Sequence, residues 1–284
     1  MINCPICSSS LNLEQTQASC AEGHQFSVKN GAYQLLKPEF KERLEKFLTA
    51  FEDFRQPYIE GMKKIDFNKL PYINGVLSDE RQWKAKRMDL ELITRLKAPG
   101  EKVLELGAWN GWLSNRLVEE GYEVLAADIF IHELDGLGAS KHYRNQWQSV
   151  QMNMDDVSIL KSSFDLIIIN RSIAFFKDLN QTIIDLKARL NPGGLLFITG
   201  INYCKDPSLI IDRYKQAEEL FNSKYNAPYA FFSSKGYMDA KDLSLLRAHK
   251  IKLSLYPSHR WKPILKWIYP KRSISYYGCY EKTN

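Results

Sequence analysis

The sequence predicts an α/β protein, with a largely parallel sheet between helical layers and a small cysteine-rich module at the N-terminus. From Glu101 onward, segments patterned as strands alternate with segments patterned as helices, which is typical of a parallel sheet. The longest apolar runs, Leu166–Ile169 and Gly194–Ile198, have the length of buried strands. Three of the five cysteines lie in the first twenty residues, which sets that part of the chain apart.

Length and composition fit one catalytic domain with a small addition. The chain has 284 residues, 44% hydrophobic and 25% charged, as is ordinary for a globular protein with a packed core. Its net charge of +6 is compatible with RNA or an anionic surface as a partner but does not require one. We expect a module at residues 1–36, a helical linker or cap at 37–100 and the main domain at 101–284.

No apolar run approaches the roughly 18 residues that span a bilayer, so we expect no transmembrane segment. The N-terminus has no charged region followed by an apolar one, and it reaches Cys4 almost at once. These features predict a cytoplasmic protein. Structural disulfides are unusual there, so we interpret the cysteines as metal ligands or, for Cys204 and Cys279, as core thiols.

Four side chains near the N-terminus are typical ligands of zinc. Cys4 and Cys7 form one closely spaced pair, and Cys20 forms a second with His24. Zinc takes four tetrahedral nitrogen or sulfur ligands, which two such pairs supply. A redox Cys-x-x-Cys motif is the alternative, but it usually accompanies a βαβ pattern that is missing here. Because so short a segment has little core, the spacing predicts a closed, structural Zn²⁺ site.

These ligands, with Gln25-Phe26 and Gly31–Leu36 after them, resemble the zinc finger of the ribosomal-RNA guanine-N1 methyltransferases. In that family the finger precedes a domain that binds S-adenosylmethionine (SAM), and it is taken to help recognise RNA. A similar ending closes the zinc ribbons of other methyltransferases. The resemblance therefore implies a methyltransferase, and it points less specifically to ribosomal RNA.

Two helices are expected between the zinc module and the main domain. Large apolar residues recur every three or four positions over 39–64, which predicts one helix, and a second is predicted over 78–96 with Asp79 as its cap. The aromatic stripe on the first is typical of core packing. Alternatively, one helix closes over the cofactor, with Trp83 and Arg87 on one face above the methionine end of SAM.

A glycine-containing turn follows the first strand of the main domain. The segments are a strand, a turn, a helix and a second strand, over Val103–Leu106, Gly107–Gly111, Trp112–Glu120 and Tyr122–Asp128. Gly107 and Gly111 let the backbone approach a ligand and turn sharply into the helix. Asp128 offers two carboxylate oxygens to the paired hydroxyls of a ribose, and Glu105 lies where it helps to hold the ammonium of methionine. An adenosyl ligand fits this arrangement.

A nicotinamide dinucleotide is the main alternative, because its sites use the same strand, turn, helix and distal acid. Its fingerprint is G-x-G-x-x-G, whereas this turn reads Gly-Ala-Trp-Asn-Gly. Trp109 stands where the backbone meets a pyrophosphate. SAM has no pyrophosphate, so this departure disfavours a dehydrogenase more than a methyltransferase.

The remaining segments continue the order of strands and helices. They are predicted as a strand, a helix, a turn into a fifth strand, and a final antiparallel pair, over Ser163–Asn170, Asp178–Leu190, Asn191–Ile198, Ile251–Tyr256 and Ser275–Glu281. In this order the motifs resemble those of class I SAM-dependent methyltransferases, of the type 11-like kind. The resemblance implies a seven-stranded Rossmann-like sheet with helices on both faces and SAM as the cofactor.

The adenine pocket is expected from Val150–Asp155, where Asn153 or Asp155 accepts from the adenine amino group. The cofactor-binding residues that we predict are Glu105, Gly107, Ala108, Trp109, Gly111, Asp128, Ile129, Asn153, Met154 and Asn170. No catalytic residue is assigned. The methyl group should face residues 170–176, which contain no obvious general base, and in-line positioning can supply much of the catalysis.

Two insertions are expected on the substrate side, at 201–238 and 257–273. The first is rich in aromatic residues. The second interleaves cations with aromatics, which suits RNA, an anionic membrane surface or an amphipathic helix that covers the core. We predict SAM-dependent methyl transfer to an unidentified acceptor, with a small molecule slightly favoured. A base of ribosomal or transfer RNA is one alternative, and a catalytically silent binding protein is another.

Overall fold

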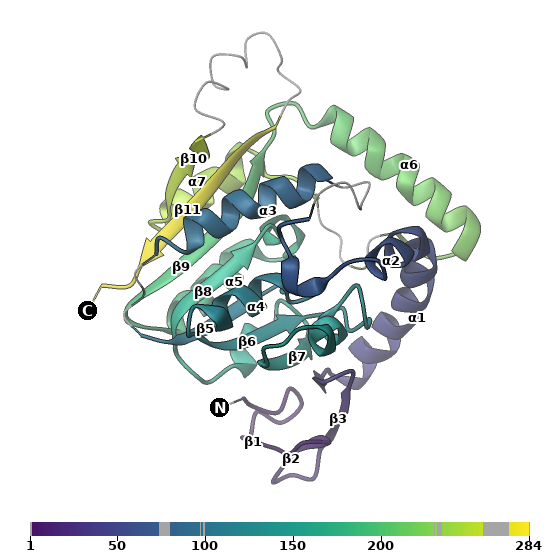
Figure 1. Ribbon diagram of the computed structural model, residues 1–284, viewed down its shortest axis with the longest axis vertical. Helices are drawn as coiled ribbons and strands as arrows, with labels where there is room; N and C mark the ends of the chain where they lie inside the picture. The colour runs from purple at the N-terminus through teal and green to yellow at the C-terminus, as the bar shows by residue number, and fades with distance from the viewer. Residues whose placement is uncertain are drawn as a thin grey trace.

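The computed structural model describes residues 2–73, 80–96, 98, 100–229, 231, 235–257 and 273–283 (Figure 1). Its elements are β1 (Leu11–Leu13), β2 (Gln17–Cys20), β3 (Gln25–Lys29), β4 (Ala32–Leu35), α1 (Pro38–Phe54), α2 (Gln56–Met62), η1 (Phe67–Lys69), α3 (Glu80–Ile93), β5 (Lys102–Leu106), α4 (Trp112–Glu119), β6 (Glu123–Asp128), η2 (Leu137–His142), β7 (Gln148–Met152), η3 (Val157–Ile159), β8 (Phe164–Asn170), η4 (Ile173–Phe175), α5 (Leu179–Ala188), β9 (Leu190–Tyr203), α6 (Ser208–Tyr225), α7 (Ala240–Ala248), β10 (Lys252–Leu255) and β11 (Ile274–Glu281). The expected cap at Asp79 and nearly all of the insertion at 257–273 lie outside the described residues.

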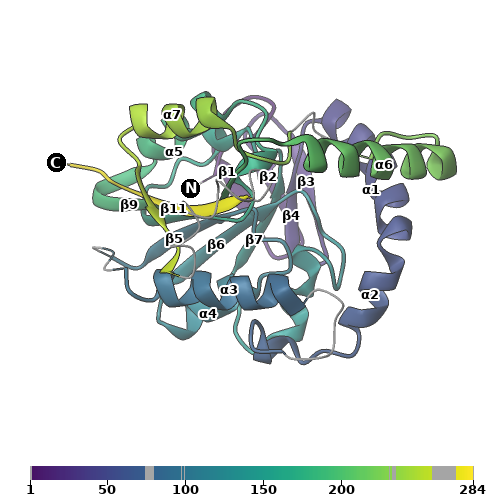
Figure 2. The same ribbon diagram turned by 90° about the horizontal axis from the view of Figure 1, so that it is seen from above.

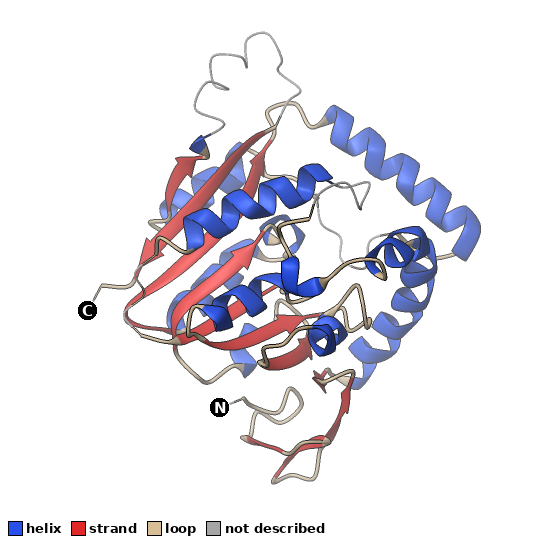
Figure 3. Ribbon diagram, in the orientation of Figure 1, coloured by secondary structure: helices blue, strands red, loops and turns tan. Residues whose placement is uncertain are grey.

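One eleven-stranded sheet runs through the molecule in the order β1-β2-β3-β4-β7-β6-β5-β8-β9-β11-β10. Strands β7, β6, β5, β8 and β9 are parallel, β11 is antiparallel to β9, and β10 is antiparallel to β11. From β7 to β10 this is the expected seven-stranded sheet. Helices α3 and α4 cover one face and α5 and α7 the other (Figures 2 and 3). The fold class predicted from the sequence is confirmed.

The N-terminal ribbon continues the main sheet. β4 pairs in parallel with β7 along its whole length, and β3 joins β4 to the rest of the ribbon. Ile2, Cys4 and Phe26 of the ribbon belong to the same hydrophobic cluster as Val150 and Met152 of β7. The main domain therefore supplies the burial that so short a ribbon lacks.

The helix expected over 39–64 is two helices, because α1 ends at Phe54 and α2 begins at Gln56. Pro57 lies in the first turn of α2, where its ring and its missing N–H prevent a continuous helix. The break places Arg55 between the helices. Helices α1, α2 and α6 lie beyond the carboxyl ends of the parallel strands, so they face the edge where ligands bind in such sheets (Figure 2).

Two details of the later chain differ from the expectation. β9 begins at Leu190 and runs through to Tyr203, so the expected turn at Asn191–Gly194 lies within the strand. Its pairing with β8 jumps from Leu190 to Leu195, so the glycines occupy an irregularity in the strand. The aromatic insertion at 201–238 contains helix α6, which the sequence pattern did not specify.

The expected helix start at Asp178 is present as a cap, and Asp239 caps α7 in the same way. The Asp178 carboxylate accepts from the backbone N–H of Gln181, and Asp239 forms a reciprocal capping box with Asp242. No helix in the described part of the chain is long and apolar enough to cross a bilayer.

Candidate functional site

The ribbon brings its four metal-binding side chains together. The ligand atoms of Cys4, Cys7, Cys20 and His24 all lie within 4.8 Å of one another. Cys20 Sγ is 3.6 Å from Cys7 Sγ and 3.4 Å from His24 Nδ1. Burial raises the pKa of the Cys20 thiol, but hydrogen bonds with Ser9 and His24 outweigh it and lower the pKa to about 6. Four converging sulfur and nitrogen ligands fit a closed, structural zinc site.

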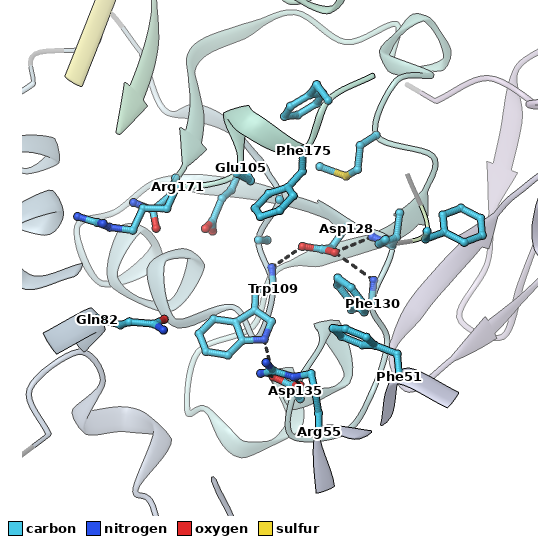
Figure 4. A pocket seen from close by; sticks show the side chains of 18 of the residues that line it. Phe51, Arg55, Gln82, Glu105, Trp109, Asp128, Phe130, Asp135, Arg171 and Phe175 are labelled. Carbon is cyan, nitrogen blue, oxygen red and sulfur yellow. Dashed lines mark hydrogen bonds and ion pairs between the residues drawn. The ribbon is translucent and has the colours of Figure 1, made fainter. Parts of the chain in front are cut away.

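A cavity of about 440 Å³ opens at the carboxyl ends of the parallel strands (Figure 4). Of the predicted cofactor residues, those that line it are Glu105, Gly107, Ala108, Trp109, Asp128, Ile129, Met154 and Asn170. Gly111 and Asn153 do not line it. The Asn153 amide oxygen instead accepts from the backbone N–H of Asp155, at 3.3 Å. The strand ends and the glycine turn therefore meet in one site, as the motif order predicted.

The two glycines of the turn have different roles. Gly107 has a φ of +83°, and a Cβ there would collide with the hydroxyl of Ser172. Gly111 has a φ of +73°, and a Cβ there would lie 2.5 Å from the ring of Trp147. Gly107 thus keeps the cavity floor open, whereas Gly111 serves the packing at the start of α4.

Asp128 lies at the end of β6 beneath a set of backbone donors. Its Oδ2 accepts from the N–H of Trp109 at 2.7 Å, and its Oδ1 accepts from the N–H groups of Ile129 and Phe130 at 2.7 and 3.0 Å. Burial raises the pKa of Asp128 to about 6, although these three hydrogen bonds lower it. The backbone therefore fixes the orientation of a carboxylate whose remaining lone pairs can accept from paired hydroxyls.

Glu105 is the second buried acid of the cavity. Its Oε2 accepts from the hydroxyl of Ser114 at 2.5 Å. Burial raises the pKa of Glu105 to about 8, and the neighbouring charge of Asp128 adds to the rise. Two buried carboxyl groups at one end of the cavity suit a ligand that carries both hydroxyls and a cationic group.

Trp109 links the glycine turn to the loop after β6, a contact that the sequence did not predict. Its indole Nε1 donates to Asp135 Oδ1 at 2.6 Å. Asp135 also accepts from Arg55, at 2.5 Å from Nε and 2.9 Å from Nη2. The carboxylate thereby joins the α1–α2 break to the cofactor turn (Figure 4).

Helix α3 does line the cavity, but with other residues than Trp83 and Arg87. Trp83 is buried and stacks on Trp109, with ring centroids 5.8 Å apart. Gln82 and Lys86 face the cavity instead, and the Lys86 ammonium lies 3.9 Å from the rings of both tryptophans. The suggested pair was therefore wrong, although the pair that lines the cavity has the same four-residue spacing, one position earlier on the helix.

A buried polar network stands behind the end of β8. Asp89 of α3 is fully buried and forms a two-pronged ion pair with Arg171, which lines the cavity. Asp89 also accepts from the Tyr256 hydroxyl at 2.5 Å and from the Asn170 amide at 3.2 Å. This network fixes Asn170, the last residue of β8, and Arg171 directly after it, which lie where the methyl group should face.

The far half of the cavity is aromatic. Phe47 and Phe51 come from α1, Phe130 follows β6, and Tyr229 and Phe231 come from the insertion at 201–238. The ring centroids of Phe51 lie 5.4 Å from Phe130 and 6.3 Å from Tyr229. The helical cap and the aromatic insertion, far apart in the sequence, thus meet over one apolar chamber. No histidine in the described part of the chain lines the cavity.

Two family models match the chain. One, described as a methyltransferase domain, matches residues 79–249, and the other, described as the N-terminal part of RlmA, matches residues 2–41. A search of curated proteins finds no match.

Solved structures with low sequence identity are similar in fold. A putative sarcosine dimethylglycine methyltransferase from Galdieria sulphuraria has a TM-score of 0.52 at 14% identity, over 81% of this chain and 98% of that one. Phosphoethanolamine N-methyltransferase 2 from Haemonchus contortus has a TM-score of 0.48 at 14% identity, over 82% of this chain and 60% of that one. Magnesium protoporphyrin IX methyltransferase from Synechocystis has a TM-score of 0.47 at 14% identity, over 82% and 98%. The chain thus spans 60% of the length of the Haemonchus enzyme.

The Galdieria structure supports the fold alone, whereas the first family model covers more than half of the chain. The chain therefore belongs to the methyltransferase domain family, and it carries a SAM-dependent methyltransferase domain after an N-terminal zinc ribbon.

Proposed function

We infer that this enzyme transfers the methyl group of SAM to a small, largely apolar acceptor bound in the aromatic half of the cavity. The observation that carries the inference is the continuity of the cavity. Buried acids line one half and aromatic side chains line the other. A donor and an acceptor held in these halves would meet between Gly107 and Phe175, which both line the cavity.

The acidic half suits SAM residue by residue. Asp128 would accept from the ribose hydroxyls, and Glu105 would lie near the methionine ammonium. Gly107 and Ala108 offer close backbone approach, and Ile129 and Met154 offer an apolar surface to the adenine. Because the Asn153 amide oxygen accepts from Asp155 and the side chain does not line the cavity, we assign the adenine contact to Met154 rather than to Asn153.

Catalysis would rest on positioning. When bound, SAM would supply an activated methyl carbon on a positively charged sulfur, so that the acceptor atom would bond to this carbon as the carbon–sulfur bond breaks and the neutral thioether leaves. The chain's own contribution is to hold the acceptor against that carbon and to exclude water, which can lower the barrier by roughly 7–11 kcal/mol when the reacting atoms are well oriented. The Phe51 and Phe130 rings supply an apolar wall, and the Arg171–Asp89 pair fixes the backbone after β8. No residue is assigned as a general base.

The RNA alternative has support from the ribbon, which matches the N-terminal part of RlmA. The charges of the cavity favour a small molecule over RNA, because, among the described residues, both guanidinium groups that line it are already paired and the Lys86 ammonium lies over two tryptophan rings. Arg55 binds Asp135 and Arg171 binds Asp89. A site for a polynucleotide would be expected to keep cations available for phosphates.

The test compares two phenylalanines on one helix. Phe51 lines the cavity, whereas Phe54 packs on Phe221 and Tyr229 and does not line it. Transfer of radiolabelled methyl to organic-soluble metabolites of a cell extract should fall at least about tenfold in Phe51→Ala and much less in Phe54→Ala. SAM affinity should stay within about twofold in both variants. Equal losses in both, or label in the RNA fraction, would refute the small-molecule assignment.

A further inference from the structure

The zinc ribbon touches the segment that forms one wall of the cofactor half of the cavity. Its β3–β4 turn contains Asn30 and Gly31, with φ values of +51° and +77°. The Asn30 amide donates to the carbonyl of Ile131 at 2.9 Å. A Cβ on Gly138 would lie 2.8 Å from the Asn30 side chain, so the turn and the loop after β6 are in close contact.

A second contact runs through buried amides. The Ser27 hydroxyl donates to Gln34 Oε1 at 2.9 Å, and Gln34 Nε2 donates to Gln151 Oε1 at 2.8 Å. Gln151 Nε2 then donates to the carbonyl of Ile129 at 2.8 Å. Gln34 and Gln151 are 6% and 1% exposed, so neither amide can exchange these partners for water without opening the β4–β7 junction.

This series of hydrogen bonds ends at Ile129, which also orients Asp128. The N–H of Ile129 donates to Asp128 Oδ1, and the carbonyl of the same residue accepts from Gln151. The position of segment 129–131 therefore depends on the ribbon side chain Gln34, and it determines the geometry of the Asp128 carboxylate. Figure 2 shows β4 beside β7, and β7 pairs with β6, the strand that this segment follows.

We propose that the ribbon is a positioning element of the SAM site, acting through Gln34 and Gln151 on the segment 129–131. Ordering of the ribbon, which its metal supplies, is thereby coupled to cofactor affinity. This role differs from RNA docking, and it uses the face of the ribbon that is joined to the sheet. It rests on SAM binding at Asp128 and is independent of the identity of the acceptor.

The sharpest variant is Gln34→Glu, which keeps the size of the side chain and removes its donor. Gln151 would then have to turn its own donor toward the new carboxylate and release Ile129. The matched control is Gln17→Glu, the same change in the same ribbon, where the amide donates to the exposed Glu14. Calorimetric titration of SAM should give a Kd raised about tenfold in Gln34→Glu and unchanged in Gln17→Glu.

A purely structural role for Gln34 would not produce the further signs that we expect. KM for SAM should rise while kcat stays close to that of the wild type. The pH at which SAM affinity is lost should move upward, because a loosened segment donates less well to Asp128. Zinc content and the melting temperature without SAM report separately whether each variant is folded.

Asn30→Gly keeps the left-handed turn and removes the bond to Ile131, so it tests the other contact between the ribbon and segment 129–131 if Gln34→Glu does not fold. It should raise the Kd for SAM severalfold. An unchanged Kd for SAM in a folded, zinc-containing Gln34→Glu or Asn30→Gly variant would overturn the proposal. If the acceptor is not a small molecule, this comparison of SAM affinities still holds, because SAM binding by the wild type is measured in the same experiment.

Discussion

The indole N–H of Trp109 donates a hydrogen bond of 2.6 Å to the carboxylate of Asp135, and the backbone N–H of Trp109 donates to Asp128. Trp109 itself has a φ of +50°, a conformation that a bulky residue seldom adopts. The two hydrogen bonds hold it there. Its side chain therefore acts as a brace between the cofactor turn and the loop after β6.

We predict that Trp109→Phe weakens SAM binding by about tenfold, because it removes the bond to Asp135 and loosens the turn. Trp147→Phe is the matched control, since the Trp147 N–H is buried without a partner among the described residues. It should leave SAM affinity within about twofold of the wild type. Isothermal titration of both variants decides the matter, and equal affinities would contradict the role given to Trp109.

SAM affinity should depend on pH through Asp128. The pKa of this group is raised to about 6 by burial, and only the ionised form accepts from both ribose hydroxyls. Affinity should therefore be high above that pH and fall as the pH drops through it, by up to about tenfold per unit. Titrations from pH 5 to 8 should show this step near pH 6 in the wild type, whereas Asp128→Asn should bind weakly and lack the step, which leaves only the titration of Glu105 nearer pH 8. A flat wild-type profile would speak against Asp128 as the ribose acceptor.

The buried pair of Asp89 and Arg171 should matter for stability. Asp89→Asn leaves the guanidinium without its charged partner, and we expect the free energy of unfolding to fall by about 3 kcal/mol. Tyr256→Phe removes one neutral donor to the same carboxylate and should cost about 1 kcal/mol. Urea denaturation followed by circular dichroism measures both. A smaller loss in Asp89→Asn than in Tyr256→Phe would contradict the importance of the ion pair.

Removal of zinc should destabilise the whole protein, because the ribbon and the main sheet share a hydrophobic cluster. A strong chelator is expected to lower the melting temperature by about 5 °C or more and to weaken SAM binding. Cys7→Ser should reproduce both effects. Cys279→Ser, which changes a thiol in β11 outside the cluster of ligands, should reproduce neither. Metal content well below about one zinc per chain in the purified protein would contradict the site.

The local features of the fold could be predicted from the sequence, whereas its long-range contacts could not. Gly107, Asp128 and the strand at 164–170 have local patterns that mark them, because turn chemistry and apolar periodicity act over a few residues. The pairing of β4 with β7 joins segments that are more than a hundred residues apart, and nothing in either segment specifies the other. The helix break could have been predicted from Pro57, but the regular spacing of the aromatic residues around it indicated one continuous helix.

The same distinction applies to the site. The strand-end acids were predictable because their position follows from the order of elements. Lys86, Arg55 and Asp135 were not, since each depends on how a helix or loop packs over the cavity. In the sequence, Trp109 only disfavours a pyrophosphate ligand. Its hydrogen bond to Asp135 is visible in the structure alone.

The most direct test is transfer of radiolabelled methyl from SAM into a cell extract separated into RNA, protein and small-molecule fractions. We predict label in the small-molecule fraction with the wild type, a loss of that label with Asp128→Ala and Phe51→Ala, and its retention with Phe54→Ala. Label confined to RNA, or no transfer by a protein that binds SAM, would contradict the account.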